Sequence, residues 1–405
     1  MVRLRTVSAF VSAALLAAPP DGAAGSSGAG AGAYDGGGRS AAVPQSPPPP
    51  VPAKGFFTQG AAVLLKRPVS LDDVAGVLYG LEPTRSQGVP GDADGPTRHP
   101  ADAYGSRLVV PFPASVPGAA RGTAAVDVAP IPWPDDMGDP EDAAGGGMAL
   151  FAAWSFGQFG PGAFPDNLAA AVAQSWHWDG AEAAVAKHAA FARVLTTYAV
   201  GSEPDDPVLP GDYDPAAELG FVTEICDRLL NLPGALCYFN PAGCCVWPAE
   251  LYRKTRAYHA DEGTAPHPLW ANVRLMKFDE DWSVMDTTGN LQLDLPDVEF
   301  VLKADRWDLH DADAQLRNLS LYLLDRGESP AGGRVIATGN TVDGPAPAGA
   351  VPGGGRDRTS DVPWRATVCE DGVAAPPRRT LRLVAQDGTE PPAELLRVRH
   401  PNRSG

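Results

Sequence analysis

The sequence is poor in positive charge and in cysteine, and it contains no long hydrophobic run. Lys and Arg together number 32 against 49 Asp and Glu, so the formal net charge at pH 7 is −17. Because a nucleic-acid surface needs clustered Lys and Arg to contact phosphates, this acidic chain is predicted not to bind nucleic acid. A membrane-spanning helix needs about 20 consecutive apolar residues. No segment approaches that length, so no membrane span is predicted.

The five cysteines lack the even, regularly spaced pattern of a disulfide-stabilised protein. Cys244 and Cys245 are adjacent, Cys226 and Cys237 lie shortly before them, and Cys369 is isolated. Buried thiols in a reducing compartment agree with this pattern at least as well as disulfides do. The redox state of the cysteines therefore stays open.

The N-terminus has the composition of a targeting segment. Arg3 and Arg5 precede the apolar stretch Val7–Ala18, whose length of about twelve residues is typical of a signal peptide. No acidic residue appears before Asp21, so an organellar transit peptide is an alternative. Residues 1–24 are predicted to direct the chain to a secretory or organellar route. The thiol pattern weakens this prediction, and a cytoplasmic protein is the alternative.

Composition divides the remainder of the chain. Glycine (45 residues) and proline (42) are above average usage and concentrate near the N-terminus and around 343–355, which marks linkers rather than folded domains. The predicted organisation is a disordered linker at 25–54, an α+β domain at 55–210, a second α+β domain at 211–330, and C-terminal strands with a tail at 331–405, interrupted by a disordered loop near 343–360.

Hydrophobic periodicity predicts alternating strands and helices in the first half. Ser70 and Asp73 form a capping-box pattern at the start of a helix over 71–80. Residues 61–67 precede it as a strand, and 107–112 and 123–131 are predicted to pair. Alanine-rich segments then predict two helices, and a β-branched run predicts a closing strand; these three segments are 166–176, 181–194 and 194–200.

The second half shows the same kinds of pattern. Apolar residues from Leu219 to Leu230 follow helical spacing and predict a buried stripe. The predicted helices are 216–230, 248–260 and 308–326, and the predicted strands are 235–240, 244–247, 269–278, 282–286, 297–302, 334–339, 364–369 and 380–385. The expected fold class is α+β, with mixed, mostly antiparallel sheets and helices on one face. Two ferredoxin-like halves are one arrangement that this order allows.

The stretch D-T-T-G at 286–289 differs by one residue from an aspartic-protease motif and from a P-type ATPase motif. An aspartic protease needs a second such motif to supply the partner carboxylate, and the sequence has none. The ATPase motif needs lysine where Thr287 stands. We therefore predict that Asp286 accepts backbone N–H groups in a turn. The predicted structural motif comprises Asp286, Thr287, Gly289, Pro296, Asp297 and Glu299.

Ser155 stands in A-W-S-F-G, a variant of the nucleophile elbow of hydrolases. An elbow requires a strand before the serine and a helix directly after it. The glycine- and aromatic-rich residues 156–164 cannot begin a helix, so a loop is the favoured interpretation. A hydrolase that uses Ser155, or a carboxylate pair from Asp286, Asp297 and Glu299, is the alternative function.

No metal or cofactor is predicted. The histidines show neither an H-x-H pattern nor an i, i+4 pair, and the acidic loop 133–142 lacks the spacing of a calcium loop. Aromatic residues beside carboxylates and a Gly-rich loop nevertheless suit a polar ligand or a partner chain. The predicted ligand surface comprises Trp133, Asp135, Asp136, Trp154, Gln158 and Phe159.

Four stretches resemble the uncharacterised family described as domain of unknown function 4261. They are ELGFVTEICDRLLNLPGALCYFNPAG (218–243), LWANVRLMKF (269–278), WSVMDTTGNLQLDLPDVEF (282–300) and LRNLSLYLLDRGE (316–328). The N-terminal half resembles larger members, whereas Cys244-Cys245 departs from the more polar turn expected there. The resemblance implies an α+β fold, and it supplies no activity and no catalytic residue.

The sequence contains no complete nucleophile, metal or cofactor constellation. It therefore predicts a non-catalytic binding or interaction protein whose partner is a protein or a small molecule.

Overall fold

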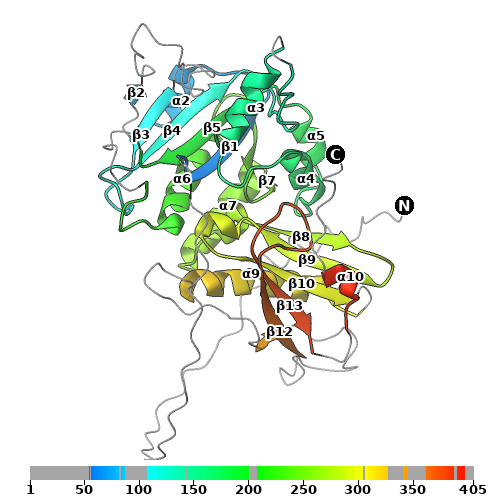
Figure 1. Ribbon diagram of the computed structural model, residues 1–405. Helices are drawn as coiled ribbons and strands as arrows, with labels where there is room; N and C mark the ends of the chain where they lie inside the picture. Colours follow the sequence, from blue (N-terminus) through cyan, green and yellow to red (C-terminus); the bar gives the residue numbers. More distant parts are fainter. Residues whose placement is uncertain are drawn as a thin grey trace, which may run out of the picture.

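Two β-sheets and the helices packed on them form an α+β fold (Figure 1). The structure is a computed structural model that describes residues 54, 56–81, 84–86, 107–142, 145–199, 208–303, 306–326, 341–344, 362–386 and 390–396. The targeting segment, the linker up to residue 53, the strand predicted at 334–339 and most of the loop predicted near 343–360 lie outside these residues.

The first sheet has seven strands, and every neighbouring pair is antiparallel. In spatial order these are β2 (Thr84–Ser86), β3 (Arg107–Pro111), β4 (Thr123–Ala129), β5 (Ala190–Thr197), β1 (Gln59–Leu65), β6 (Ala235–Asn240) and β7 (Cys245–Trp247). Because β1 pairs with β6, the sheet takes strands from both sides of residue 210, where the sequence suggested a domain boundary.

The second sheet has six strands and is antiparallel except where β10 pairs with β13. In spatial order these are β11 (Thr341–Gly344), β12 (Val362–Cys369), β13 (Thr380–Ala385), β10 (Asp297–Lys303), β9 (Trp282–Thr288) and β8 (Asn272–Lys277). A ferredoxin-like unit is a β-α-β-β-α-β arrangement, and neither sheet follows that order.

Helices cover both faces of the first sheet, whereas the sequence predicted one face. The helices are α2 (Leu71–Val77), α3 (Gly147–Ser155), α4 (Asn167–Ala173), α5 (Ala181–Val185), α6 (Pro215–Leu229), α7 (Ala249–Asp261), α8 (His267–Trp270), the 3₁₀ helix η2 (Asn290–Leu293), α9 (Leu309–Arg326) and α10 (Ala393–Leu396). Alternate residues of β1 explain this arrangement. Val63 faces the core that contains α6, and Leu64 faces the core that contains α3 and α4. Continuous apolar strands are typical of sheets buried on both sides.

One hydrophobic core joins the two sheets. It extends from α6 and β1 through Trp270 to β10 and to Leu316 of α9. Figure 1 shows α7 and α9 in the region where the sheets meet. Among the residues that the structure places, none of the helices combines the length and the apolar character needed to span a bilayer.

The local signals at helix starts are confirmed, and one helix prediction is wrong. Ser70 and Asp73 form both hydrogen bonds of the capping box of α2. The predicted helix 181–194 ends at Val185, and residues 190–197 form β5, a strand buried along its whole length between β4 and β1. Alanine favours helices only weakly, and burial between two strands outweighs that preference.

Candidate ligand-binding pocket

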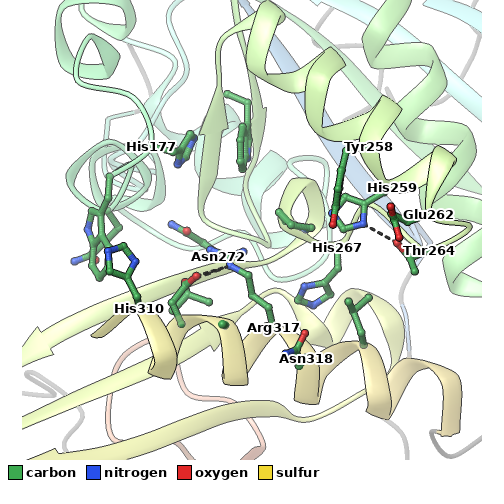
Figure 2. A pocket seen from close by; sticks show the side chains of 18 of the residues that line it. His177, Tyr258, His259, Glu262, Thr264, His267, Asn272, His310, Arg317 and Asn318 are labelled. Carbon is green, nitrogen blue, oxygen red and sulfur yellow. Dashed lines mark hydrogen bonds and ion pairs between the residues drawn. The ribbon is translucent and has the colours of Figure 1, made fainter. Parts of the chain in front are cut away.

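A cavity of about 310 Å³ lies where the two sheets meet, and four of the seven histidines line it (Figure 2). Its walls come from the segment after α4, from β7 and β8, from α7, α8 and the loop between them, and from α9. Contacts of α8 with α7, β7 and α9 bring these elements together. The four histidines are His177, His259, His267 and His310.

His267 is a buried, neutral hydrogen-bond acceptor in the cavity wall. Its Nε2 lies 2.7 Å from Oδ1 of Asn290, whose amide nitrogen donates to the carbonyl oxygen of Pro296 and to two hydroxyls. Because Oδ1 can only accept, Nε2 of His267 carries the proton. Burial, assisted by the positive charge of Arg317, lowers the pKa of His267 to about 4. Its Nδ1 therefore keeps a free lone pair, and this buried atom has no hydrogen-bond partner among the described residues.

Arg317 supplies the complementary group from α9. Its Nε donates to both carboxylate oxygens of Asp313, at 3.2 and 3.0 Å, one helical turn earlier. Its Nη1 is buried and has no partner in the described part of the chain. Figure 2 shows the side chains of His267 and Arg317 at the same cavity, one from α8 and the other from α9. His267 and Arg317 thus both line the cavity, each with one buried polar atom that has no partner among the described residues.

Aromatic rings and a second neutral imidazole form another part of the wall. The ring of His177 stacks on Trp247 with centroids 3.8 Å apart and an interplanar angle of 25°. Its Nε2 donates to the carbonyl oxygen of Val246 at 2.9 Å, and burial lowers its pKa to about 4. Trp176 and Tyr258 also line the cavity.

The third histidine is also held neutral. Nδ1 of His259 lies 2.8 Å from Oγ1 of Thr264, and burial, together with Arg317, lowers the pKa of the imidazole. Within the described residues, no group of three or more His, Cys, Asp or Glu side chains is placed to hold a metal ion. The chemistry that this arrangement supports is hydrogen bonding and stacking.

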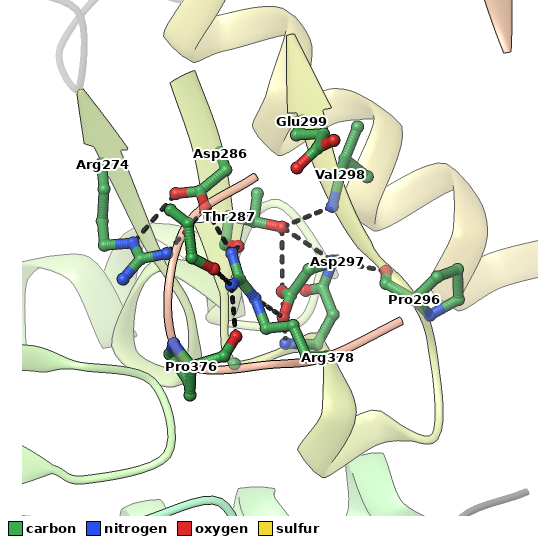
Figure 3. A network of polar contacts seen from close by, with 12 residues as sticks. Arg274, Asp286, Thr287, Pro296, Asp297, Val298, Glu299, Pro376 and Arg378 are labelled. Carbon is green, nitrogen blue, oxygen red and sulfur yellow. Dashed lines mark hydrogen bonds and ion pairs between the residues drawn. The ribbon is translucent and has the colours of Figure 1, made fainter. Parts of the chain in front are cut away.

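Asn290 connects the pocket to a buried ion network around the D-T-T-G stretch (Figure 3). The backbone N–H of Asn290 and Oγ1 of Thr287 both donate to Oδ1 of Asp297, at 3.0 and 2.9 Å. Oδ2 of Asp297 accepts Nε of Arg378 at 2.8 Å. A continuous chain of hydrogen bonds therefore runs from His267 to the ion network.

Asp286 binds two arginines rather than the backbone amides that the sequence suggested. Arg274 holds it with two parallel bonds, Nε to Oδ1 at 2.9 Å and Nη2 to Oδ2 at 2.6 Å, and Nη2 of Arg378 donates to Oδ2 as well. Burial alone would raise the pKa of Asp286, but the two guanidinium groups outweigh it and hold the pKa below its usual value. Asp286 is thus a permanently charged part of the fold.

Strand register explains the placement of these charges. Arg274, Asp286, Glu299 and Arg382 are paired positions on the neighbouring strands β8, β9, β10 and β13. They form a row across the sheet in which each acid has its own arginine. Burial, with Asp286 nearby, raises the pKa of Glu299, although Arg382 opposes this. Asp286 and Glu299, two of the three carboxylates considered for catalysis, are therefore side by side, but both are buried and paired with arginines.

The remaining motif residues shape the turn. Gly289 has φ of 125°, and a Cβ there would lie 2.5 Å from the carbonyl oxygen of Trp270. The carbonyl oxygen of Pro296 accepts the Asn290 side chain. Asp286 itself lies within β9 and binds arginines, so the prediction that it accepts backbone N–H groups in a turn is wrong on both counts.

Ser155 does not lie on a nucleophile elbow. It is the last residue of α3, and its Oγ donates to the carbonyl oxygen of Phe151 at 2.9 Å. The loop preferred from the sequence begins only at Phe156, because residues 147–155 are helical. An elbow presents its serine between a strand and a helix, so Ser155 lacks the local geometry that the hydrolase alternative required.

The structure brings together most of the predicted ligand surface, but it buries the rings. Trp133, Trp154 and Phe159 pack on one another in a core cluster, and Gln158 is buried beside them. Asp135 accepts the backbone N–H groups of Leu168 and Ala169 and so caps α4. Asp136 is exposed and accepts the N–H of Gly138. Trp133 and Asp135 nevertheless line a second cavity, of about 800 Å³, beside α4 and α5.

The pocket residues could not be found as a set in the sequence. His177, His259, His267 and His310 come from four separate segments, and no spacing relates them. The only local signal is that His259 and His267 border one loop.

No family model matches this chain, and neither the curated proteins nor the solved structures contain a match.

Proposed function

We propose that the protein is a non-catalytic binding protein whose ligand is a small molecule held in the histidine-lined pocket. The supporting observation is the cavity itself, whose wall combines the polar side chains of His267 and Arg317 with the aromatic rings of Trp247 and Tyr258.

The size and composition of the cavity support the same function. Its volume of about 310 Å³ is at the lower end of the range of small-molecule sites, about 300–1,000 Å³. Such sites combine aromatic walls with a few polar groups that orient the ligand, as Trp247, His177 and His267 do here. A non-catalytic role is supported by the pairing of Asp286 and Glu299 with arginines and by the position of Ser155 at a helix end.

Two earlier expectations remain part of this proposal. The resemblance to domain of unknown function 4261 is kept as a proposed family relationship, and it assigns no activity. A secretory or organellar route through residues 1–24 is tested by fusing residues 1–54 to a fluorescent reporter and locating the fusion in cells.

Binding is tested with a variant whose new side chain occupies the pocket. Ala314 of α9 is exposed and lines the cavity, so Ala314→Trp places an indole in it. Ala257→Trp is the matched control, because Ala257 is an exposed alanine on the neighbouring α7 that does not line the cavity. We expect ligand-observed NMR with a chemically diverse fragment library to detect compounds that bind the wild type and Ala257→Trp but not Ala314→Trp. A library without binders, or equal binding to both variants, would refute the proposal.

A further inference from the structure

The cavity of about 800 Å³ beside α4 and α5, called here the α4–α5 cavity, has a different chemical character from the histidine-lined pocket. The two helices contact each other on the same side of the first sheet (Figure 1). Their apolar side chains, including Leu168, Val172 and Val185, form part of the wall. The volume is within the range of small-molecule sites, about 300–1,000 Å³. Of the described residues, only Trp176 lines both cavities.

Two tryptophan rings in this wall are accessible to a ligand. Trp176 and Trp178 are half-buried and belong to the segment between α4 and α5. Two turns fold this segment, because the N–H of Trp178 donates to the carbonyl oxygen of Ser175 at 3.0 Å and that of Ala181 donates to the carbonyl oxygen of Trp178 at 3.1 Å. A Cβ added at Gly180 would lie 3.1 Å from Nε1 of Trp178. The indole of Trp178 is thus held beside the start of α5.

The charged side chains in the described part of the wall are all carboxylates. Asp135, Asp179 and Glu182 line the cavity, and no Lys or Arg is among the described residues that do so. Nε2 of His188 accepts the N–H of Trp133 at 3.0 Å, so this nitrogen carries no proton and the imidazole is neutral. A concave surface lined with charge of one sign concentrates the electric field inside it. The cavity therefore attracts cations.

The hydrogen bonds of the wall indicate which kind of cation fits. Asp135 accepts the N–H groups of Leu168 and Ala169 with its two oxygens, at 2.8 and 2.9 Å, and Glu182 is exposed to water. These acids supply negative charge, but the largely apolar wall offers little to bind the three N–H groups of a primary ammonium. An alkylated ammonium has fewer N–H groups to satisfy, and its charge is attracted to the faces of tryptophan rings.

We infer that the α4–α5 cavity binds a small organic cation with an alkylated ammonium group, such as a quaternary ammonium. The ammonium group lies against the rings of Trp176 and Trp178, and the carboxylates of the wall balance its charge. This site is separate from the one proposed for the histidine-lined pocket.

Four probe compounds of similar size test the ligand class. Choline carries a quaternary ammonium, 3,3-dimethylbutan-1-ol has the same shape with carbon in place of nitrogen, 3,3-dimethylbutanoate is an anion, and ethanolamine carries a primary ammonium. Dissociation constants are measured by ligand-observed NMR titration against the full chain. We expect choline to bind at least about tenfold more tightly than each of the other three, because only choline combines a positive charge with an apolar surface around it.

A charge-reversal variant tests whether choline binds in this cavity. Glu182→Lys places a positive charge in the first turn of α5, at an exposed position that lines the cavity. We expect it to weaken choline binding at least about threefold. Glu250→Lys is the matched control, because Glu250 is an exposed acid in the first turn of α7 and does not line the cavity. It changes the net charge equally and should leave the dissociation constant unchanged.

A ring variant tests the contact with the aromatic wall. Trp178→Leu removes the indole and keeps an apolar side chain, and Trp178 does not line the histidine-lined pocket. We expect the preference for choline over 3,3-dimethylbutan-1-ol to fall at least about threefold. Because Trp178 also packs against a core cluster, the ratio of the two dissociation constants is compared. A loss of packing would weaken both compounds alike and leave that ratio unchanged, which would refute the contact with the ring.

The other outcomes are equally decisive. Binding of the alcohol or the carboxylate as tight as that of choline refutes a cation site, and equal binding of ethanolamine refutes the alkylated class. Choline that fails to bind, or that binds Glu182→Lys and Glu250→Lys equally well, also contradicts the inference. None of these results bears on the histidine-lined pocket, which the fragment screen with Ala314→Trp tests.

Discussion

The most demanding test of the fold concerns the buried charge of Asp286. Asp286→Asn removes the negative charge shared by Arg274 and Arg378, whose side chains are almost fully buried. After the change, Arg378 still contacts Asp297, whereas Arg274, among the described residues, keeps the carbonyl oxygen of Ala375 and the uncharged amide oxygen at position 286. One guanidinium is then buried without a counter-charge.

The expected cost follows from that orphaned charge. Breaking a buried ion pair by removing one partner typically destabilises a protein by about 3–5 kcal/mol. The free energy of unfolding of a whole domain is only about 5–15 kcal/mol. We therefore expect Asp286→Asn to lower the midpoint of urea unfolding by about 1–2 M, at a slope of about 2–3 kcal/mol per M, as followed by far-UV circular dichroism.

A surface cluster with the same pairing provides the matched control. Asp227 also binds two arginines, Nε of Arg253 at 2.8 Å and Nη1 of Arg256 at 2.6 Å, but its side chain is 25% exposed against 0% for Asp286. Water can solvate the arginines that Asp227→Asn leaves behind, so this variant should cost less than about 1 kcal/mol.

The reasoning is refuted if Asp286→Asn costs no more than Asp227→Asn. It also requires that Arg274→Met, added to Asp286→Asn, recovers part of the lost stability, because the second change removes the orphaned charge. A double variant that is less stable than Asp286→Asn would show that the cost comes from lost packing instead.

Three further predictions concern the histidines, the turn and the thiols. Because the pKa of His267 falls from 6.5 to about 4 on folding, the unfolded chain binds more protons between these values. Stability therefore falls as the pH decreases through this window, and urea unfolding should show the wild type losing about 2 kcal/mol more than His267→Gln between pH 7 and pH 5. Gly289→Ala should lower the unfolding free energy by at least about 2 kcal/mol, because the added Cβ would collide with the backbone. Gly76→Ala should raise it by about 0.5–1 kcal/mol, because Gly76 is helical and has free space around the added Cβ. A thiol reagent should modify Cys369 in the folded protein and spare the other four cysteines, because these are buried and burial raises the pKa of Cys237 and Cys244 to about 12; rapid modification of two or more thiols would contradict this.

The sequence predicted the elements whose signals are local. The capping box at Ser70, the stripe on α6 and the β8–β9 hairpin depend on residues close together in the chain, and all three are present. The strand at 190–197 was mistaken for helix because its burial is decided by β4 and β1, which lie far away in sequence.

The candidate site could be predicted even less, because its parts are contributed by distant segments. His267 becomes an acceptor only through Asn290, and Arg317 reaches the cavity only because α9 packs near α8. Similarly, the first three residues of D-T-T-G belong to β9 and only Gly289 lies in the turn, and the partners of Asp286 come from β8 and from the segment before β13. Arg378 in particular stands 92 positions from Asp286 in the chain.

The D-T-T-G stretch and the pocket are nevertheless connected by hydrogen bonds through Asn290. Asp297 holds the backbone N–H of Asn290, and the Asn290 side chain determines which nitrogen of His267 carries the proton. If Asn290 were rotated or replaced, Nδ1 could carry the proton instead, and the free lone pair would move to Nε2. The network that looked like a damaged catalytic motif therefore acts on the wall of the pocket from outside it, because it fixes which nitrogen of His267 carries the proton.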